Sequence, residues 1–218
     1  MSKGSGSSSG GSGALSGMVN RSELTQDQLN SLQWYQGVGH DRINAELRGD
    51  NPVRDQYTLD TTTERIDSAM DKSKIAKNTK VYRGVLIETP EGRKAIDAMQ
   101  VGKTVTDKGY VSTSRSKEEA KKFGYGSSVS IDIKVPKGTK ALYMPRINPR
   151  RGVKERELLL DRNTKYKVVK RTDKDGITKI TQTIWNTRRE EIVDLIKEDM
   201  QEIDPQSQSS EAIQLQSV

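Results

Sequence analysis

The spacing of apolar residues changes along this chain of 218 residues from a helical period to a strand period. Near the N-terminus, Leu29, Leu32 and Tyr35 recur every three positions, which is typical of an amphipathic helix. From residue 80 onward short β-prone runs dominate, and residues 128–135 alternate between apolar and polar. Helices followed by strands predict an α+β fold, because a parallel α/β sheet needs alternating elements.

Capping residues, glycines and prolines divide these patterns into elements. Three helices are predicted first: one after the caps at residues 22–26 that breaks at residues 37–39, one from Asp41 to Gly49, and one over residues 59–75. Short helices are expected over residues 92–99 and 116–123, and strands at 80–86, 104–105, 109–114, 128–135, 140–144, 157–160, 166–170 and 177–185.

The two ends of the chain differ in composition from its centre. Residues 1–17 are almost entirely Gly and Ser, which predicts a flexible linker, and residues 205–218 are Ser/Gln-rich, which predicts a disordered tail. Residues 187–204 carry the stripe of an amphipathic helix, which either packs on the domain or docks a partner. One folded domain is therefore expected over residues 18–186.

Composition excludes several kinds of site. The chain has no cysteine and one histidine, His40, so a thiolate or histidine metal site has few candidates and no metal is expected. No run approaches the ~20 apolar residues of a membrane span. The N-terminus lacks the apolar core of a secretory signal, so we expect a cytoplasmic protein that does not use a membrane. The net charge of +7 favours acidic partners, or only keeps the protein soluble.

Two carboxylates stand two positions apart at the head of an apolar run, in Glu155-Arg156-Glu157-Leu158. Alternate residues of a strand share a face, so Glu155 and Glu157 are predicted to lie side by side with Arg156 pointing away. Adjacent like charges are costly unless solvent, a cation or a substrate shares them. Taken alone, the pair fits a solvated strand edge better than a functional site.

Two polar motifs precede this pair at the ends of predicted strands. Arg83-Gly84 follows Lys80-Val81-Tyr82, and Ser112-Thr113-Ser114 follows Gly109-Tyr110-Val111. With the glutamate pair, their order resembles the arginine-serine-glutamate class of mono-ADP-ribosyltransferases, the exoenzyme family of bacterial toxins and phage enzymes. Residues 40–48 are similar to the family's Tyr-x-x-Ile-Asn-x-x-Leu-Arg element, and the resemblance spans roughly residues 22–186.

The resemblance implies an ADP-ribosyltransferase fold, with two packed mixed β-sheets and an N-terminal helical lobe, and NAD as co-substrate. Breaking the bond between nicotinamide and ribose develops positive charge at the ribose carbon, which a carboxylate stabilises. We assign that role to Glu157, hydrogen-bonded to the ribose 2′-hydroxyl and held by Ser112. Thr113 and Ser114 would brace the pocket wall.

The remaining matched residues form the expected NAD-binding set. Arg83 would bind the pyrophosphate with its planar guanidinium, followed by Gly84 where toxins often have a second arginine. His40 stands where the family has a nucleotide-contacting tyrosine; it is read either as such a contact or as a residue flanking a helix. Asn44 belongs to the same element. Phe123 stands where the family places an aromatic beside phosphate and nicotinamide, and is also read as a core residue.

Glu155 has a different expected task. A guanidinium has a pKa above about 12 and is a poor nucleophile until a carboxylate binds it and accepts a proton. The family's Glu-x-Glu members modify arginine, so the resemblance implies transfer of ADP-ribose to arginine on a protein, with release of nicotinamide. Residues 145–154 lie where the family reads its target. Their arginines suit an acidic partner or are themselves modified: Arg146, Arg150 and Arg151.

Two other functions stay open. The acceptor could be a base of RNA or DNA, since the chain is basic. Alternatively, the chain could be a non-catalytic binding module of a phage or toxin assembly. The resemblance is compatible with a bacterial toxin, a toxin with an antitoxin or immunity protein as partner, and a phage-encoded modifier.

Overall fold

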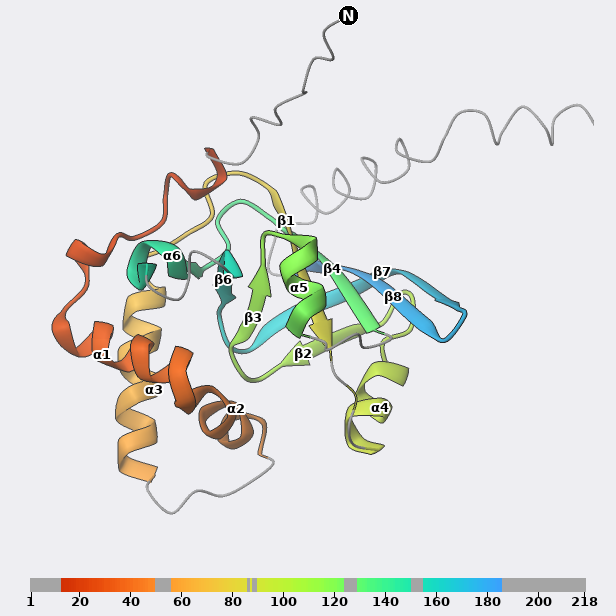
Figure 1. The fold of residues 1–218 in the computed structure, drawn as a ribbon, viewed down its shortest axis with the longest axis horizontal. Coiled ribbons are helices and arrows are strands. Elements are labelled where there is room, and N and C mark those ends of the chain that lie inside the picture. Colours follow the sequence, from red (N-terminus) through yellow and green to blue (C-terminus); the bar gives the residue numbers. More distant parts are fainter. Residues whose placement is uncertain are drawn as a thin grey trace, which may run out of the picture. The chain divides into compact units, whose positions relative to one another are not determined.

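The structure is a computed structural model that describes residues 13–49, 56–85, 87, 90–123, 129–149 and 155–185. It confirms the α+β fold: three helices precede the first strand, and the strands follow (Figure 1). The α-helices are α1 (Gln26–Trp34), α2 (His40–Arg48), α3 (Gln56–Met70), α4 (Pro90–Asp97), α5 (Lys117–Phe123) and α6 (Met144–Ile147). The strands are β1 (Thr79–Val85), β2 (Thr104–Asp107), β3 (Val111–Ser114), β4 (Val129–Val135), β5 (Ala141–Tyr143), β6 (Glu157–Leu160), β7 (Thr164–Lys174) and β8 (Ile177–Ile184).

All eight strands hydrogen-bond into one mixed sheet, in the order β2-β7-β8-β4-β1-β3-β6-β5. Strands β4 and β8 are parallel, and the other pairings among the described strands are antiparallel. Two packed mixed sheets were expected. They are instead joined through β1 and β3 at the single pair Tyr82–Ser114. In Figure 1, β3 and β6 run steeply across β2, β7 and β8.

The first helix begins where its capping residues predict. The Thr25 hydroxyl accepts from the backbone N–H of Gln28 (3.2 Å), and the Gln28 side chain accepts from the backbone N–H of Thr25 (2.9 Å). This reciprocal pair satisfies two N–H groups that the first turn of a helix leaves free. At the other end, α2 stops at Gly49, whose φ of 82° is left-handed and suits glycine.

The predicted break at residues 37–39 is wrong. The chain passes from α1 into α2 through a π-helix, Tyr35–Gly39, and stays helical. Glycine permits this because a Cβ on Gly39 would lie 2.3 Å from the ring of Trp34. The wider turn, common at functional sites, changes which side chains face the sheet.

Two predicted boundaries also move. Helix α3 ends at Met70, short of the predicted residue 75, and the N–H of Ile75 donates instead to Thr139 O (2.9 Å). The linker prediction is wrong for residues 13–17, since Ala14 is buried and its carbonyl accepts from the N–H of Ala76 (2.9 Å). Residues 1–12, the predicted helix at 187–204 and the predicted tail at 205–218 lie outside the described residues.

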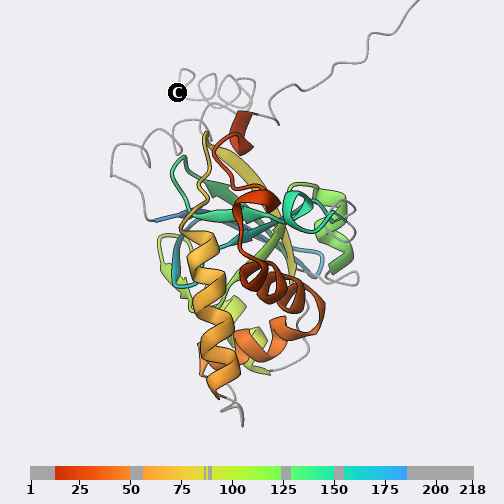
Figure 2. The ribbon, with the colours of Figure 1, turned by 90° about the vertical axis from the view of Figure 1, so that its left-hand side faces the viewer.

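Strand β6 separates two apolar clusters and is buried along its whole length. Leu158 and Leu160 pack with the sheet cluster, whereas Leu159 packs with the cluster formed by α1, α2 and α3. Figure 2 shows these three helices in front of the sheet. Since alternate residues share a face, Glu157 lies on the same side as Leu159, toward the helices. No helix in the described part of the chain is long and apolar enough to cross a membrane.

Candidate active site

Glu157 is the first residue of β6, and its side chain is only 8% exposed. Its Oε2 accepts a hydrogen bond from Gln36 Nε2 (2.9 Å), and the Ser112 hydroxyl lies close enough to the carboxylate to lower its pKa. Burial raises the pKa of Glu157 above its usual range, while the bonds from Ser112 and Gln36 act in the opposite direction. The site therefore holds a desolvated carboxylate that its neighbours stabilise in the ionised form.

Strand β3 supplies the serine and fixes the start of β6. Thr113 Oγ1 donates to Leu158 O (2.6 Å), and Ser114 Oγ donates to Glu155 O (2.6 Å). Ser112 keeps an exposed side chain on the face of β3 that Glu157 shares in β6. Thr113 and Ser114 thus tie the two strands together, and Ser112 is left to contact the carboxylate.

The strand geometry predicted for Glu155 is wrong. Strand β6 begins only at Glu157, and Arg156 has a left-handed φ of 48°, so alternation does not extend back to Glu155. Glu155 nevertheless lies close to Glu157, as its negative charge contributes to raising the pKa of Glu157. Its side chain is half-buried and that of Arg156 is exposed. Two carboxylates with unequal solvent access can take separate roles.

Tyr35 is a buried member of the site that the sequence stripe identified only as a helix position. Its hydroxyl accepts from Asn44 Nδ2 (2.9 Å), and the Ser112 hydroxyl lies close enough to lower its pKa. Burial raises the pKa of Tyr35 to about 12. Asn44 Oδ1 in turn accepts from the N–H of Tyr110 (2.9 Å), so Asn44 links the helices to the sheet. The ring of His40 lies edge-on to Tyr35, at 6.3 Å between centroids, and its side chain is 47% exposed.

A cluster of two arginines and one aspartate lies at the meeting point of α2, β1 and β2. Arg83 Nη1 is 3.6 Å from Asp107 Oδ2, and Arg48 Nε is 3.0 Å from Asp107 Oδ1. Arg48 is therefore a second basic residue beside Arg83. Gly84, which follows Arg83 in the sequence, carries no charge. Asp107 was missed because nothing in its local sequence distinguishes it. Of Phe123 the structure describes only its place at the end of α5.

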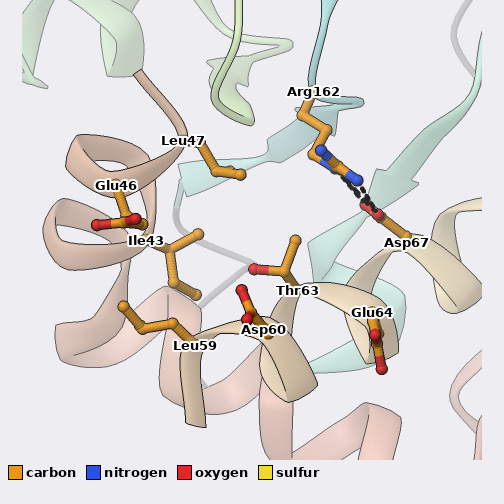
Figure 3. Close-up of a pocket in the computed structure, with 9 residues that line it drawn as sticks. All are labelled: Ile43, Glu46, Leu47, Leu59, Asp60, Thr63, Glu64, Asp67 and Arg162. Atoms are coloured by element: carbon orange, nitrogen blue, oxygen red, sulfur yellow. Dashed lines mark hydrogen bonds and ion pairs between the residues drawn. The ribbon is translucent and has the colours of Figure 1, made fainter. Parts of the chain in front are cut away.

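A hollow of about 270 Å³ opens between α2 and α3 on a different face of α2 (Figure 3). Ile43 and Leu47 line it, while Asn44 and Arg48, each one position further on, contact groups of the sheet. Its lining is mostly apolar and acidic, with one threonine and one arginine: Ile43, Glu46, Leu47, Leu59, Asp60, Thr63, Glu64, Asp67 and Arg162. Within the described residues, no three His, Cys, Asp or Glu side chains gather as metal ligands.

Known proteins share this fold. The toxin BECa of a C. perfringens binary enterotoxin aligns with a TM-score of 0.61 and 23% identity, over 75% of this chain and 44% of that chain. Plx2a, an ADP-ribosyltransferase toxin from Paenibacillus larvae, aligns with a TM-score of 0.58 and 25% identity, over 76% of this chain and 89% of that one.

Sequence comparison agrees with the fold. The NAD(+)–protein-arginine ADP-ribosyltransferase Tre1 from Serratia proteamaculans is 27% identical over 156 residues, which is 71% of this chain. The chain spans only 31% of the length of Tre1. A family model described as ADP-ribosyltransferase exoenzyme matches residues 17–189. The chain belongs to the ADP-ribosyltransferase exoenzyme family.

Proposed function

We propose that this chain is an NAD-dependent mono-ADP-ribosyltransferase that transfers ADP-ribose to arginine on a protein and releases nicotinamide. The observation that carries the proposal is the buried Glu157 carboxylate, held by Ser112 and Gln36 with the charge of Glu155 beside it. Membership of the family gives this pair its chemical context.

In the proposed reaction, the bond between the ribose carbon and the nicotinamide nitrogen breaks, and nicotinamide leaves with the bonding electrons. The ribose then carries oxocarbenium-like positive charge, which Glu157 stabilises while it holds the 2′-hydroxyl. Arg83 and Arg48 bind the pyrophosphate through their charged N–H groups. Ser112 holds Glu157, and Thr113 and Ser114 keep its strand in register.

The acceptor step uses Glu155. The arginine nitrogen attacks the ribose carbon and forms the new C–N bond, and its proton passes to Glu155. The relative Tre1 is named as a protein-arginine enzyme, which supports this acceptor. His40, Asn44, Gly84 and Phe123 complete the proposed NAD pocket. Of the arginines expected to face the target, Arg146 instead donates to Leu15 O and Met18 O (2.9 and 3.1 Å), and the other two lie outside the described residues.

The acceptor is tested by incubating the protein and cell lysate with NAD labelled in its adenylate phosphate. We expect label that survives nuclease, disappears with protease, and maps to arginine by mass spectrometry. Label lost only to nuclease would instead show a nucleic-acid acceptor, and absence of nicotinamide release would exclude an NAD-cleaving enzyme. An antitoxin or immunity protein and a cytoplasmic location stay predictions.

A further inference from the structure

We propose that Gln36 is a positioning residue for Glu157, and that Asn148 sets the orientation of Gln36, a role that rests on the proposed NAD cleavage. Gln36 Nε2 donates to Glu157 Oε2 (2.9 Å), and Asn148 Nδ2 donates to Gln36 Oε1 (2.8 Å). Three residues from the π-helix, the end of α6 and the start of β6 thus form one chain of hydrogen bonds.

The chemistry of the groups fixes the direction of this chain. An ionised carboxylate only accepts hydrogen bonds, so the amino group of Gln36 must face Glu157. The carbonyl oxygen of Gln36 then faces Asn148, which must present its own amino group. Each donor in such a series polarises the next, and the bond to the carboxylate is strengthened.

Asn148 is attached to a rigid part of the fold. It caps α6, with its N–H donating to Met144 O (2.7 Å). Met144 and Ile147 are fully buried, and Arg21 Nη1 donates to Ile147 O (2.8 Å). The Asn148 amide, held in this way, keeps the Gln36 amide from flipping and exchanging the places of its oxygen and nitrogen.

The π-helix explains how Gln36 reaches the site. Neighbouring residues of an α-helix diverge by about 100° around the axis, so two in succession seldom serve one group. Here the negative charge of Glu157 contributes to the raised pKa of Tyr35, and Gln36 donates a hydrogen bond directly to Glu157. Two consecutive residues of the widened turn thus lie close to this carboxylate, and Gln36 is the one that bonds it.

The consequence for catalysis concerns the charge on Glu157. Burial favours the neutral acid, as does the nearby charge of Glu155, whereas Ser112 and Gln36 favour the ionised form. Among the described residues, Tyr35 is another titratable group close to Glu157, and it stays neutral below its raised pKa of about 12. Without Gln36, Ser112 remains as the described side chain that lowers the pKa of Glu157 and favours its ionised form.

The first test replaces the amide without changing its length, in Gln36→Met. In nicotinamide release without acceptor, we expect the acid limb of the pH profile to move up by about one pH unit, and kcat at low pH to fall roughly tenfold. KM for NAD should change little. The control is Gln26→Met on α1, where the exposed amide bonds only Asn30 among the contacts described (2.8 Å). An unmoved acid limb in Gln36→Met overturns the proposal.

The second test addresses Asn148. In Asn148→Asp, the new carboxylate accepts only, so it favours a reversed Gln36 amide whose oxygen faces Glu157. Asn148→Asp should therefore shift the acid limb further than Asn148→Leu. The shift should be much smaller in a Gln36→Met background, which retains the added charge but has no amide to reverse. Equal shifts in both backgrounds would show a through-space effect of charge. They would overturn the proposed relay, the series of hydrogen bonds from Asn148 through Gln36 to Glu157.

A direct titration separates this proposal from the proposed function. In the full chain labelled with carboxyl-13C glutamate, the resonance lost in Glu157→Gln identifies Glu157, and its pKa is read by NMR. A higher pKa in Gln36→Met and Asn148→Asp than in the wild type supports the relay, even if the wild type releases no nicotinamide. An unchanged pKa in folded variants overturns the relay while leaving NAD cleavage unaffected.

Discussion

Arg48 makes a two-point ion pair with Asp107, with Nε–Oδ1 at 3.0 Å and Nη2–Oδ2 at 3.2 Å. Arg83 lies 3.6 Å from the same carboxylate. Two guanidinium groups beside one carboxylate repel each other, and the shared aspartate offsets that repulsion. One negative charge does not neutralise two positive ones, so the cluster keeps an excess charge suited to a pyrophosphate.

The first prediction concerns this two-point contact. Lysine carries a single point charge and cannot reproduce a planar fork, so Arg48→Lys should raise KM for NAD roughly tenfold with little loss of kcat. Arg83→Ala should raise it further. Nicotinamide release measured against NAD concentration checks both, with Arg65→Lys as control, since Arg65 pairs with Asp27 on the helices. An unchanged KM in Arg48→Lys would remove Arg48 from the binding set.

The second prediction tests the role of Glu157. Glu157→Gln keeps the size of the side chain but removes the negative charge that opposes the oxocarbenium ion. Both nicotinamide release and arginine transfer should fall by at least ~100-fold. Circular dichroism establishes that the variant is folded, and Glu64→Gln, an exposed position on α3, serves as control. Retained release in folded Glu157→Gln would transfer the role to another group.

The third prediction separates the two carboxylates. Glu155→Gln should lose arginine transfer, because the acceptor guanidinium no longer finds a base, yet it should keep nicotinamide release. Parallel assays with labelled NAD, with and without an arginine-containing acceptor, measure both steps. Equal loss of the two activities would show that Glu155 serves NAD cleavage itself.

The α+β fold could be predicted from the change of hydrophobic period. Arg83, Ser112 and Glu157 were predicted as site residues because the order of their short motifs resembles that of a known family, and the structure brings Ser112 and Glu157 together. Gln36 and Asn148 were not found, because their partners lie 121 and 112 residues away in the sequence. No local pattern encodes such contacts, and they exist only once the helices pack on the sheet.

Two errors have local physical causes. Glycines at residues 37 and 39 indicate a helix break, but the Trp34 ring occupies the space above Gly39 and the helix widens instead. Alternation from Glu157 back to Glu155 fails because Arg156 is left-handed. In both cases one residue departs from the regular period on which the prediction depends.

The fourth prediction is a pH dependence of stability. Burial raises the pKa of Glu157 in the folded protein. Below the ordinary glutamate pKa of about 4.3, Glu157 is protonated in both the folded and the unfolded state, so its ionisation does not lower the free energy of unfolding. As pH rises, the unfolded chain ionises first and the free energy of unfolding falls until the folded group also ionises. Thermal unfolding from pH 4 to 8 should show the melting temperature of the wild type dropping relative to Glu157→Gln, and then a constant difference. A difference independent of pH would contradict the raised pKa.

The last prediction concerns the π-helix. A methyl group on Gly39 would lie 2.3 Å from the Trp34 ring, which real contacts do not allow, so Gly39→Ala must displace the ring or the turn. We expect a loss of about 1–3 kcal/mol in the free energy of unfolding, measured by urea denaturation. Because Gln36 belongs to the same turn, nicotinamide release should fall as well. In a Trp34→Leu background the clash is removed, and Gly39→Ala should cost much less than in the wild type. An equal cost in both backgrounds would show that the glycine is required by the backbone and not by the ring.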